Sequence, residues 1–178
     1  MEEFWISFWP NLASTVIGII IGFPVAVWLN KLALSHTVKK QQESDKADLH
    51  RTLNAVGGSI DHNTEKLTTL LQAVGSGHFL IDTGFDTASW QAYNAQLARL
   101  NSNIELNKQL ISYHERISNL TVINSKLCNN YLGLESSLSG ADKVREFLRG
   151  HIMTEASKLS VESANIRASI NTVCGIVA

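Results

Sequence analysis

The sequence predicts an all-α protein in which an N-terminal transmembrane helix is followed by an antiparallel four-helix bundle. Three observations predict this class: an uncharged apolar run near the N-terminus, apolar residues that recur at alternating steps of three and four, and prolines at positions 10 and 24 alone. Proline is common at the turns and edges of β folds, so its absence after residue 34 favours long helices. We divide the chain into a transmembrane anchor over 1–34, a basic juxtamembrane linker over 35–48 and a cytosolic helical bundle over 49–178.

The anchor is predicted from an apolar run over 12–29 that carries no charged residue. A helix of this length spans about 27 Å, close to the roughly 30 Å of a hydrocarbon core. Trp5 and Trp9 precede the run and Trp28 lies at its other end, as expected of aromatic rings at the two membrane interfaces. A secretory signal peptide is the competing interpretation, but the chain begins with acidic residues and the apolar run is too long.

Lysine residues near the anchor lie on its C-terminal side, at positions 31, 39, 40 and 46, whereas the preceding residues contain no lysine or arginine. Because positive residues stay on the cytoplasmic side, we expect the N-terminus outside and the C-terminal domain in the cytoplasm. The protein is then a single-pass protein of the inner, cytoplasmic membrane.

Small residues recur at every fourth position of the anchor: Ser14, Gly18, Gly22 and Ala26. Positions four apart lie on nearly one face of a helix, and small residues let helices approach closely. We therefore expect this face to be a transmembrane interface of a homo-oligomer. Glycine is common in membrane helices for other reasons, which is the alternative explanation, and a narrow pore between several copies stays open as a further consequence.

Beyond the linker, apolar residues follow the a/d spacing of helices that pack side by side. We expect four helices: 44–74, a second that follows a cap at Asp86 or Thr87 and ends at Leu100, a third that runs from an Asn101–Asn103 cap to Leu138, and a fourth from about Ala141 to Val173. Short connections favour antiparallel neighbours.

Three polar or glycine positions interrupt these apolar patterns. Asn63 occupies a core position of the first helix and Asn124 one of the third. Such an asparagine either fixes register or oligomeric state between helices or makes a hydrogen bond within one chain, and the pattern supports both equally. Gly57-Gly58 weakens the first helix, so the pair is either a hinge or the point where a neighbour comes close.

The composition excludes several function classes. A net charge of −1 is not the basic excess of proteins that bind duplex nucleic acid. Two cysteines, Cys128 and Cys174, are too few for a disulfide framework or a zinc site. The sequence has no phosphate-binding glycine loop or dinucleotide motif, so we expect no enzyme, no cofactor, no metal and no catalytic residue.

One stretch, "FLIDTGFDT" at 79–87, resembles the active-site signature of retroviral-type aspartic proteases. That family has Ser or Ala after the glycine and strands around the motif, whereas this chain has Phe85 and helical patterns. We expect a loop in which Asp82 makes a turn and Ile81 and Phe85 close the end of the bundle. A metal site at His78, Asp82 and Asp86 is disfavoured because the spacing has no established coordination pattern.

A cluster of cations falls in the first three turns of the fourth helix: Lys143, Arg145, Arg149 and His151. Cations oppose the helix dipole there unless an anion binds beside them. Free amides at a helix start together with two arginines are suited to a phosphate-bearing ligand. The plain alternative is a solvated charged face.

Residues 49–124 resemble a broad set of small prokaryotic proteins that combine one N-terminal membrane helix with a compact helical domain. The resemblance is carried by two groups of residues: Leu53, Asn63, Leu67 and Leu70, and then "DTASWQAY", Leu97, Leu100, Leu106, Leu110, Tyr113, Ile117, Leu120 and Asn124. Some such proteins are membrane effectors of type III CRISPR systems that sense cyclic oligoadenylate. The resemblance carries no ligand-binding residue over to this chain.

The resemblance implies a self-associating effector in antiviral defence. Its cytosolic domain would sense an anionic ligand, such as a cyclic oligonucleotide of the oligoadenylate type, and perturb the membrane. The alternative is a membrane-tethered scaffold that docks a partner protein and binds no small molecule. Arginines that converge on a symmetry axis would favour the ligand, whereas an exposed apolar groove along the third or fourth helix would favour the partner protein.

Overall fold

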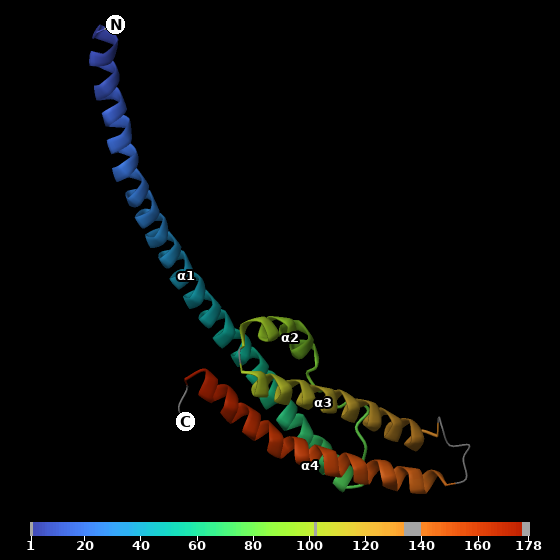
Figure 1. Cartoon of the computed structure of the whole chain (residues 1–178). Helices are drawn as coiled ribbons and strands as arrows, with labels where there is room; N and C mark the ends of the chain where they lie inside the picture. Colours follow the sequence, from blue (N-terminus) through green and yellow to red (C-terminus); the bar gives the residue numbers. More distant parts are fainter. Residues whose placement is uncertain (1, 102, 134–139, 176–178) are drawn as a thin grey trace. The chain divides into compact units, whose positions relative to one another are not determined.

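The computed structural model describes residues 2–101, 103–133 and 140–175, with side chains from Phe8 onward except Asn11. Within these residues all regular structure is α-helical. The helices are α1 (Glu2–Gly75), α2 (Ala88–Leu100), α3 (Ile104–Tyr131) and α4 (Ala141–Val173) (Figure 1). The all-α class is thus confirmed. Helix α3 ends at Tyr131, so the predicted end at Leu138 is wrong: the described chain leaves the helix at Leu132, and Gly133 has a φ of 77°. Leu138 itself lies outside the described residues.

Helix α1 is much longer than the predicted helix over 44–74, because helical structure continues through the anchor and through residues 35–48. Residues 35–48 include three Lys and two Gln, which are good helix formers, and contain no Gly or Pro. The hydroxyls of Ser35 and Thr37 donate hydrogen bonds to the carbonyls of Leu32 and Ala33, one turn back within the helix. The sequence between anchor and bundle therefore contains no residue that stops a helix, even though its composition changes.

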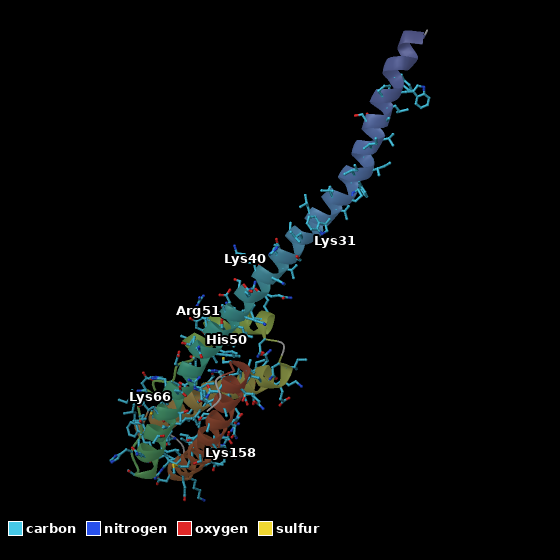
Figure 2. All side chains as sticks on the ribbon, turned by 90° about the vertical axis from the view of Figure 1, so that its left-hand side faces the viewer. Lys31, Lys40, His50, Arg51, Lys66 and Lys158 are labelled. Carbon is cyan, nitrogen blue, oxygen red and sulfur yellow. The ribbon has the colours of Figure 1, made fainter. Side chains whose placement is uncertain are left out.

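The chain divides into two compact units, Met1–Lys46 and Ala47–Ala178. In the first unit the described apolar side chains, such as Ile20 and Phe23, are exposed. Of the described helices, α1 is the one that is long and apolar enough to cross a membrane, judged by its length and composition, with a mean hydropathy of 2.2 in its most apolar window. Lys31 and Lys40 follow that stretch and extend into solvent (Figure 2).

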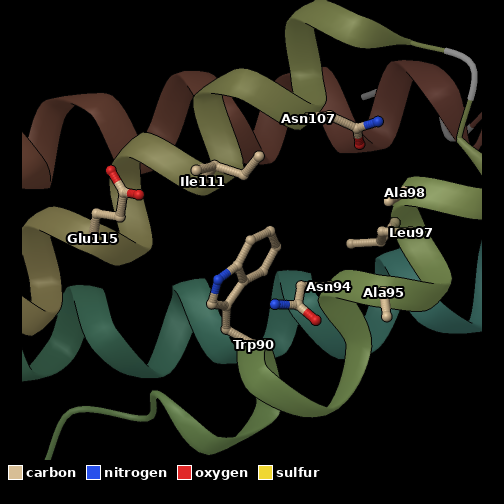
Figure 3. A pocket seen from close by; sticks show the side chains of 8 residues that line it. All are labelled: Trp90, Asn94, Ala95, Leu97, Ala98, Asn107, Ile111 and Glu115. Atoms are coloured by element: carbon tan, nitrogen blue, oxygen red, sulfur yellow. The ribbon is translucent and has the colours of Figure 1, made fainter.

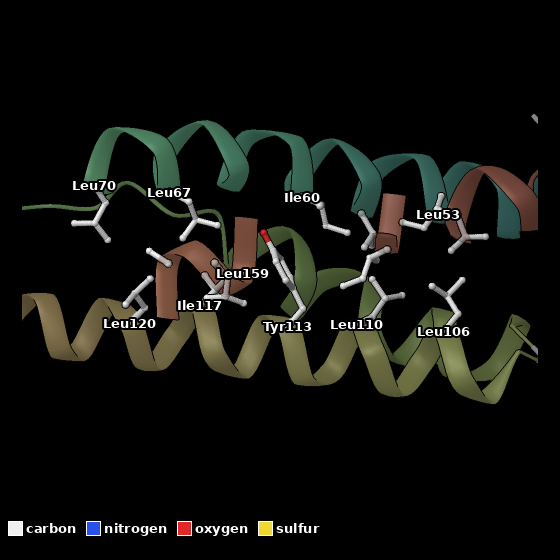
Figure 4. Close-up of a cluster of buried hydrophobic side chains, with 14 of the residues drawn as sticks. Leu53, Ile60, Leu67, Leu70, Leu106, Leu110, Tyr113, Ile117, Leu120 and Leu159 are labelled. Atoms are coloured by element: carbon white, nitrogen blue, oxygen red, sulfur yellow. The ribbon is translucent and has the colours of Figure 1, made fainter. Parts of the chain in front are cut away.

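The second unit has a core of leucine and isoleucine side chains contributed by α1, α2, α3 and α4. Along α1 the core residues include Leu53, Ile60, Leu67 and Leu70, and along α3 they include Leu106, Leu110, Ile117 and Leu120. Figure 4 shows these two series side by side and in the same direction, with Leu159 of α4 packed between the helices. Helices α1 and α3 are therefore parallel neighbours.

Helix α4 runs in the opposite direction to α3. Near the start of α4, the guanidinium of Arg145 donates a 2.8 Å hydrogen bond to Asn130 at the end of α3, and further along α4 the Glu155 carboxylate accepts one from Arg116 at 3.0 Å. The antiparallel order predicted for all four helices is not confirmed, because residues 76–87 and α2 lead the chain back along α1 before α3 begins (Figure 1).

Asn63 and Asn124 hold this returning connection in place. The Asn63 amide donates to the carbonyl of Asp86 at 3.1 Å and accepts from the Asp86 backbone N–H at 2.7 Å. Asn124 donates to the carbonyl of Leu80 at 2.7 Å, and that carbonyl also accepts from the Cys128 thiol. Both asparagines thus fit the interpretation of a hydrogen bond within one chain, because each donates to a backbone carbonyl of the connection, although the buried Oδ1 of Asn124 has no partner.

The predicted starts of the second and third helices are confirmed, and each has a capping bond. The Asp86 carboxylate accepts a 3.0 Å hydrogen bond from the N–H of Ser89 in the first turn of α2. The Asn103 side chain accepts one of 3.0 Å from the N–H of Leu106 in the first turn of α3. Each bond satisfies one of the N–H groups that a helix start leaves without an intrahelical partner.

Candidate functional site

The two arginines of the predicted anion site hold the ends of other helices. Arg145 donates to the side chain of Asn130 at 2.8 Å and to its carbonyl at 3.1 Å, and its guanidinium lies 5.1 Å from the centre of the Tyr131 ring. Arg149 donates to the carbonyl of Val74 at 2.8 Å. Asn130 and Val74 belong to the last turns of α3 and α1, where carbonyl groups lack helical partners and attract cations.

The other two cations of the predicted site lie elsewhere on α4. Lys143 and His151 are exposed and border an open hollow of about 710 Å³ that also contacts Phe147 and Lys158. Glutamates line the same hollow, so its charge is mixed rather than strongly basic. The four residues expected to form one site are therefore divided between the helix ends and the outside of α4.

A continuous stripe of exposed residues runs along the outside of α4, and we call it the α4 outer surface: Val144, Phe147, His151, Thr154, Lys158 and Val161. Phe147 is 71% exposed and Val161 is 67% exposed. The stripe borders three hollows, of about 370, 710 and 440 Å³, which adjoin through shared residues. Apolar side chains that protrude into solvent beside such hollows are typical of docking surfaces.

An ion-pair network beside this surface was not predicted from the sequence. Arg116 of α3 pairs with Glu155 at 3.0 Å and with Glu162, both on α4. Lys158 also pairs with Glu155 at 3.1 Å. The hydrogen bond from Lys158 and the contact with Arg116 lower the pKa of Glu155 below its usual range despite partial burial. The 39-residue separation of the α3–α4 pair leaves no local signal in the sequence that could have identified it.

A separate hollow of about 510 Å³ lies between α2 and α3 (Figure 3). Trp90 and Leu97 of α2 face Ile111 and Glu115 of α3 across it. Trp90 is the first large apolar residue of α2. The remaining lining residues are two alanines and two asparagines, so the walls are largely apolar and the rim carries one carboxylate.

His114 is buried beneath Trp90, with 1% of its surface exposed. The two rings stack with their centres 4.6 Å apart, and neither imidazole nitrogen has a hydrogen-bond partner. Burial disfavours the charged form, so it lowers the pKa of His114 to about 4, although the nearby Asp86 acts in the opposite direction. The ring is therefore neutral at physiological pH and serves as packing rather than as an acid–base group.

The "FLIDTGFDT" loop connects α1 to α2, and both of these neighbouring elements are helical. The Asp82 carboxylate accepts a 2.9 Å hydrogen bond from the N–H of Gly84, so the predicted turn is confirmed. Phe85 packs on the core, but Ile81 is 82% exposed, so its predicted role in closing the bundle is wrong. The described residues contain no strand beside the motif and no group of three or more His, Cys, Asp or Glu that could bind a metal.

The predicted transmembrane interface is exposed along its length. Ser14 and Ala26 are exposed, and no atom lies within 4 Å of the position where a Cβ would stand at Gly18 or Gly22. The face is thus open to another helix, and its pairing with a second copy stays a prediction.

Comparison with known proteins identifies no relative: no family model, no curated protein and no solved structure matches the chain.

Proposed function

We propose that this chain is a self-associating, single-pass membrane protein whose helical unit acts as a scaffold and docks protein through the α4 outer surface. The observation that carries the proposal is that surface, where Phe147 and Val161 protrude from a helix whose opposite side is buried in the core. The proposal requires only that α3 and α4 are antiparallel, and it does not depend on the antiparallel arrangement predicted for all four helices. In this proposal the anchor lies in the cytoplasmic membrane, with the N-terminus outside and the helical unit in the cytoplasm.

The positions of Arg145 and Arg149 favour the scaffold over the ligand-responsive effector. Both guanidinium groups already donate to backbone carbonyls, so an anion would have to displace two charge-assisted hydrogen bonds before it gained its own. Such bonds contribute about 1.5–3 kcal/mol each. A ligand that relied on these arginines would therefore bind more weakly than it would to two arginines without hydrogen-bond partners.

The antiviral effector remains the second candidate, because Lys143, His151 and Lys158 border one hollow of about 710 Å³. A phosphate-bearing ligand such as a cyclic oligoadenylate would place its anionic groups against these three side chains. In this candidate, binding at the outside of α4 changes the association of the membrane helices and perturbs the membrane.

Native mass spectrometry of the full chain in detergent, with and without cyclic oligoadenylates, separates the two candidates. The scaffold predicts oligomers whose mass is unchanged by the nucleotide. The effector predicts an added ligand mass that Lys143→Glu with Lys158→Glu removes and that the matched double variant Lys39→Glu with Lys40→Glu retains. Detection of monomers alone under all conditions would refute self-association itself.

A further inference from the structure

We infer that the α4 outer surface pairs with the same surface of a second copy of this chain, with the two α4 helices antiparallel. The inference rests on the proposed function and names the docked partner as a second copy. It is argued from the order of side chains along the stripe, from its charges and from the small residues at its edge.

The order of apolar and polar residues along the stripe is similar when it is read from either end. Apolar side chains lie at both ends, Val144 and Phe147 at one and Val161 at the other, while His151 and Thr154 lie between them. A two-fold interface requires a surface that complements itself when it is turned around. In an antiparallel pair, Val144 of one copy meets Val161 of the other, and both His151–Thr154 contacts fall near the centre.

The charge of Lys158 favours an antiparallel pair of α4 helices over a parallel pair. A parallel pair in register would place Lys158 against Lys158 of the second copy, and like charges in contact are unfavourable. The antiparallel register that joins Val144 to Val161 instead places Lys158 against Phe147. The aliphatic part of the lysine then covers the exposed ring, and its ammonium lies where the ring face attracts a cation. The Lys158 ammonium also pairs with Glu155 of its own chain at 3.1 Å, and its side chain is 62% exposed, so it is free to reach the second copy.

One edge of the stripe permits close approach of the helix backbones. Gly150, Ser157 and Ala164 are exposed and recur at seven-residue intervals beside the stripe. No atom lies within 4 Å of the position where a Cβ would stand at Gly150. The glutamates on the other edge, Glu155 and Glu162, are already paired with Arg116 of their own chain, so they bring little net charge to the second copy.

The pair is small by the standards of stable dimers. The stripe from Val144 to Val161 is about 26 Å long at 1.5 Å per residue, and one helix face of that length buries less than the roughly 1,600 Å² of a standard interface. Two chains held in one membrane meet at a high effective concentration, under which a weak contact becomes populated. We therefore expect α4 pairing to add to the association of the membrane helices rather than to replace it.

Disulfide cross-linking between differently tagged full-length chains in membranes tests the register directly. Chains with Val144→Cys mixed with chains with Val161→Cys should form a mixed disulfide dimer. Either variant alone should not form one, because positions 144 and 161 are about 26 Å apart along the helix and an antiparallel pair separates identical positions. The parent chain serves as the blank, because Cys128 and Cys174 are buried. A mixture of Ile81→Cys and Ile104→Cys chains, whose substituted positions are exposed elsewhere, should also give no dimer.

Adding Phe147→Glu to the mixed pair should lower the yield of the disulfide dimer roughly tenfold, since replacing a large apolar contact residue by a charge typically has an effect of this size. Ile81→Glu, an exposed apolar residue outside the stripe, should leave the yield unchanged. Dimers from Val144→Cys alone would overturn the antiparallel register. Absence of any dimer from a chain that native mass spectrometry shows to be oligomeric would overturn α4 pairing while leaving self-association intact.

Discussion

Gly57 and Gly58 are neighbours on α1 but have different surroundings. Gly57 is buried, and the guanidinium of Arg167 from α4 occupies the space that a Cβ atom there would need. Gly58 is exposed, and nothing lies within 4 Å of its corresponding position. Of the two explanations that the sequence left open, a hinge or a close neighbour, Gly57 therefore supports the close neighbour.

The two glycines should respond differently to alanine. Alanine gains about 1 kcal/mol of helix propensity over glycine, and Gly58→Ala should show that gain as added stability. Gly57→Ala receives the same gain but displaces Arg167, which loses its 3.3 Å ion pair with Asp61 and its packing on α1. A partly exposed ion pair contributes up to about 1 kcal/mol, and the flexible guanidinium can move aside at little further cost. We expect Gly58→Ala to be the more stable variant by about 1 kcal/mol.

Urea unfolding of the full chain in detergent, followed by helical circular dichroism, measures this difference as a shift in midpoint. The sharper test repeats both substitutions in an Arg167→Ala background. With the guanidinium removed, Gly57→Ala should become as favourable as Gly58→Ala, and the double-mutant cycle should assign the difference to the Gly57–Arg167 contact. Equal midpoints for the two single variants in the parent chain would refute the reasoning.

Three further predictions concern the helical unit and the anchor. Asn63→Ala should destabilise the chain by about 2–3 kcal/mol, because it removes two buried hydrogen bonds to the connection, whereas the exposed Asn94→Ala should change urea stability by less than about 0.5 kcal/mol. The free energy of unfolding should fall by up to about 3 kcal/mol as the pH drops from 6.5 toward 4, because His114 binds a proton in the unfolded chain but stays neutral when it is buried in the folded one. His114→Phe should flatten that part of the urea–pH profile, and an unchanged slope would show that His114 is not the cause. Gly18→Leu with Gly22→Leu should reduce the oligomer fraction in native mass spectrometry without loss of membrane insertion, and an unchanged fraction would make the small-residue face incidental.

The starts of the later helices could be predicted because their signals are local. Asp86 lies three residues before the N–H that it caps, and so does Asn103, so a short window of sequence contains the whole interaction. The end of α1 at Gly75 is equally local, because glycine is favoured after the last helical turn and residues 76–78 make the closing hydrogen bonds.

The direction of α3 could not be predicted from such windows. Short connections suggested that each helix turns back on the one before it, but residues 76–87 are extended enough to return beside α1 before α2 begins. What fixes that path is the pair of buried amides, Asn63 and Asn124, each of which bonds a backbone group of the connection more than 20 residues away. The sequence shows that Asn63 and Asn124 interrupt the apolar pattern, but only the folded structure shows which backbone groups they bond.

The arginines of α4 show the same limit in electrostatic terms. Judged against the dipole of their own helix, Arg145 and Arg149 stand at the unfavourable end, which is why an anion seemed to be required. In the structure, α4 begins beside the last turns of α3 and α1, so both guanidinium groups meet the carbonyl ends of two other helices. The positions of Arg145 and Arg149 are therefore unfavourable with respect to the dipole of α4 but favourable with respect to the dipoles of α1 and α3. The charge pattern needs no ligand to be stable, and an anion that binds at these arginines must first release the ends of α1 and α3.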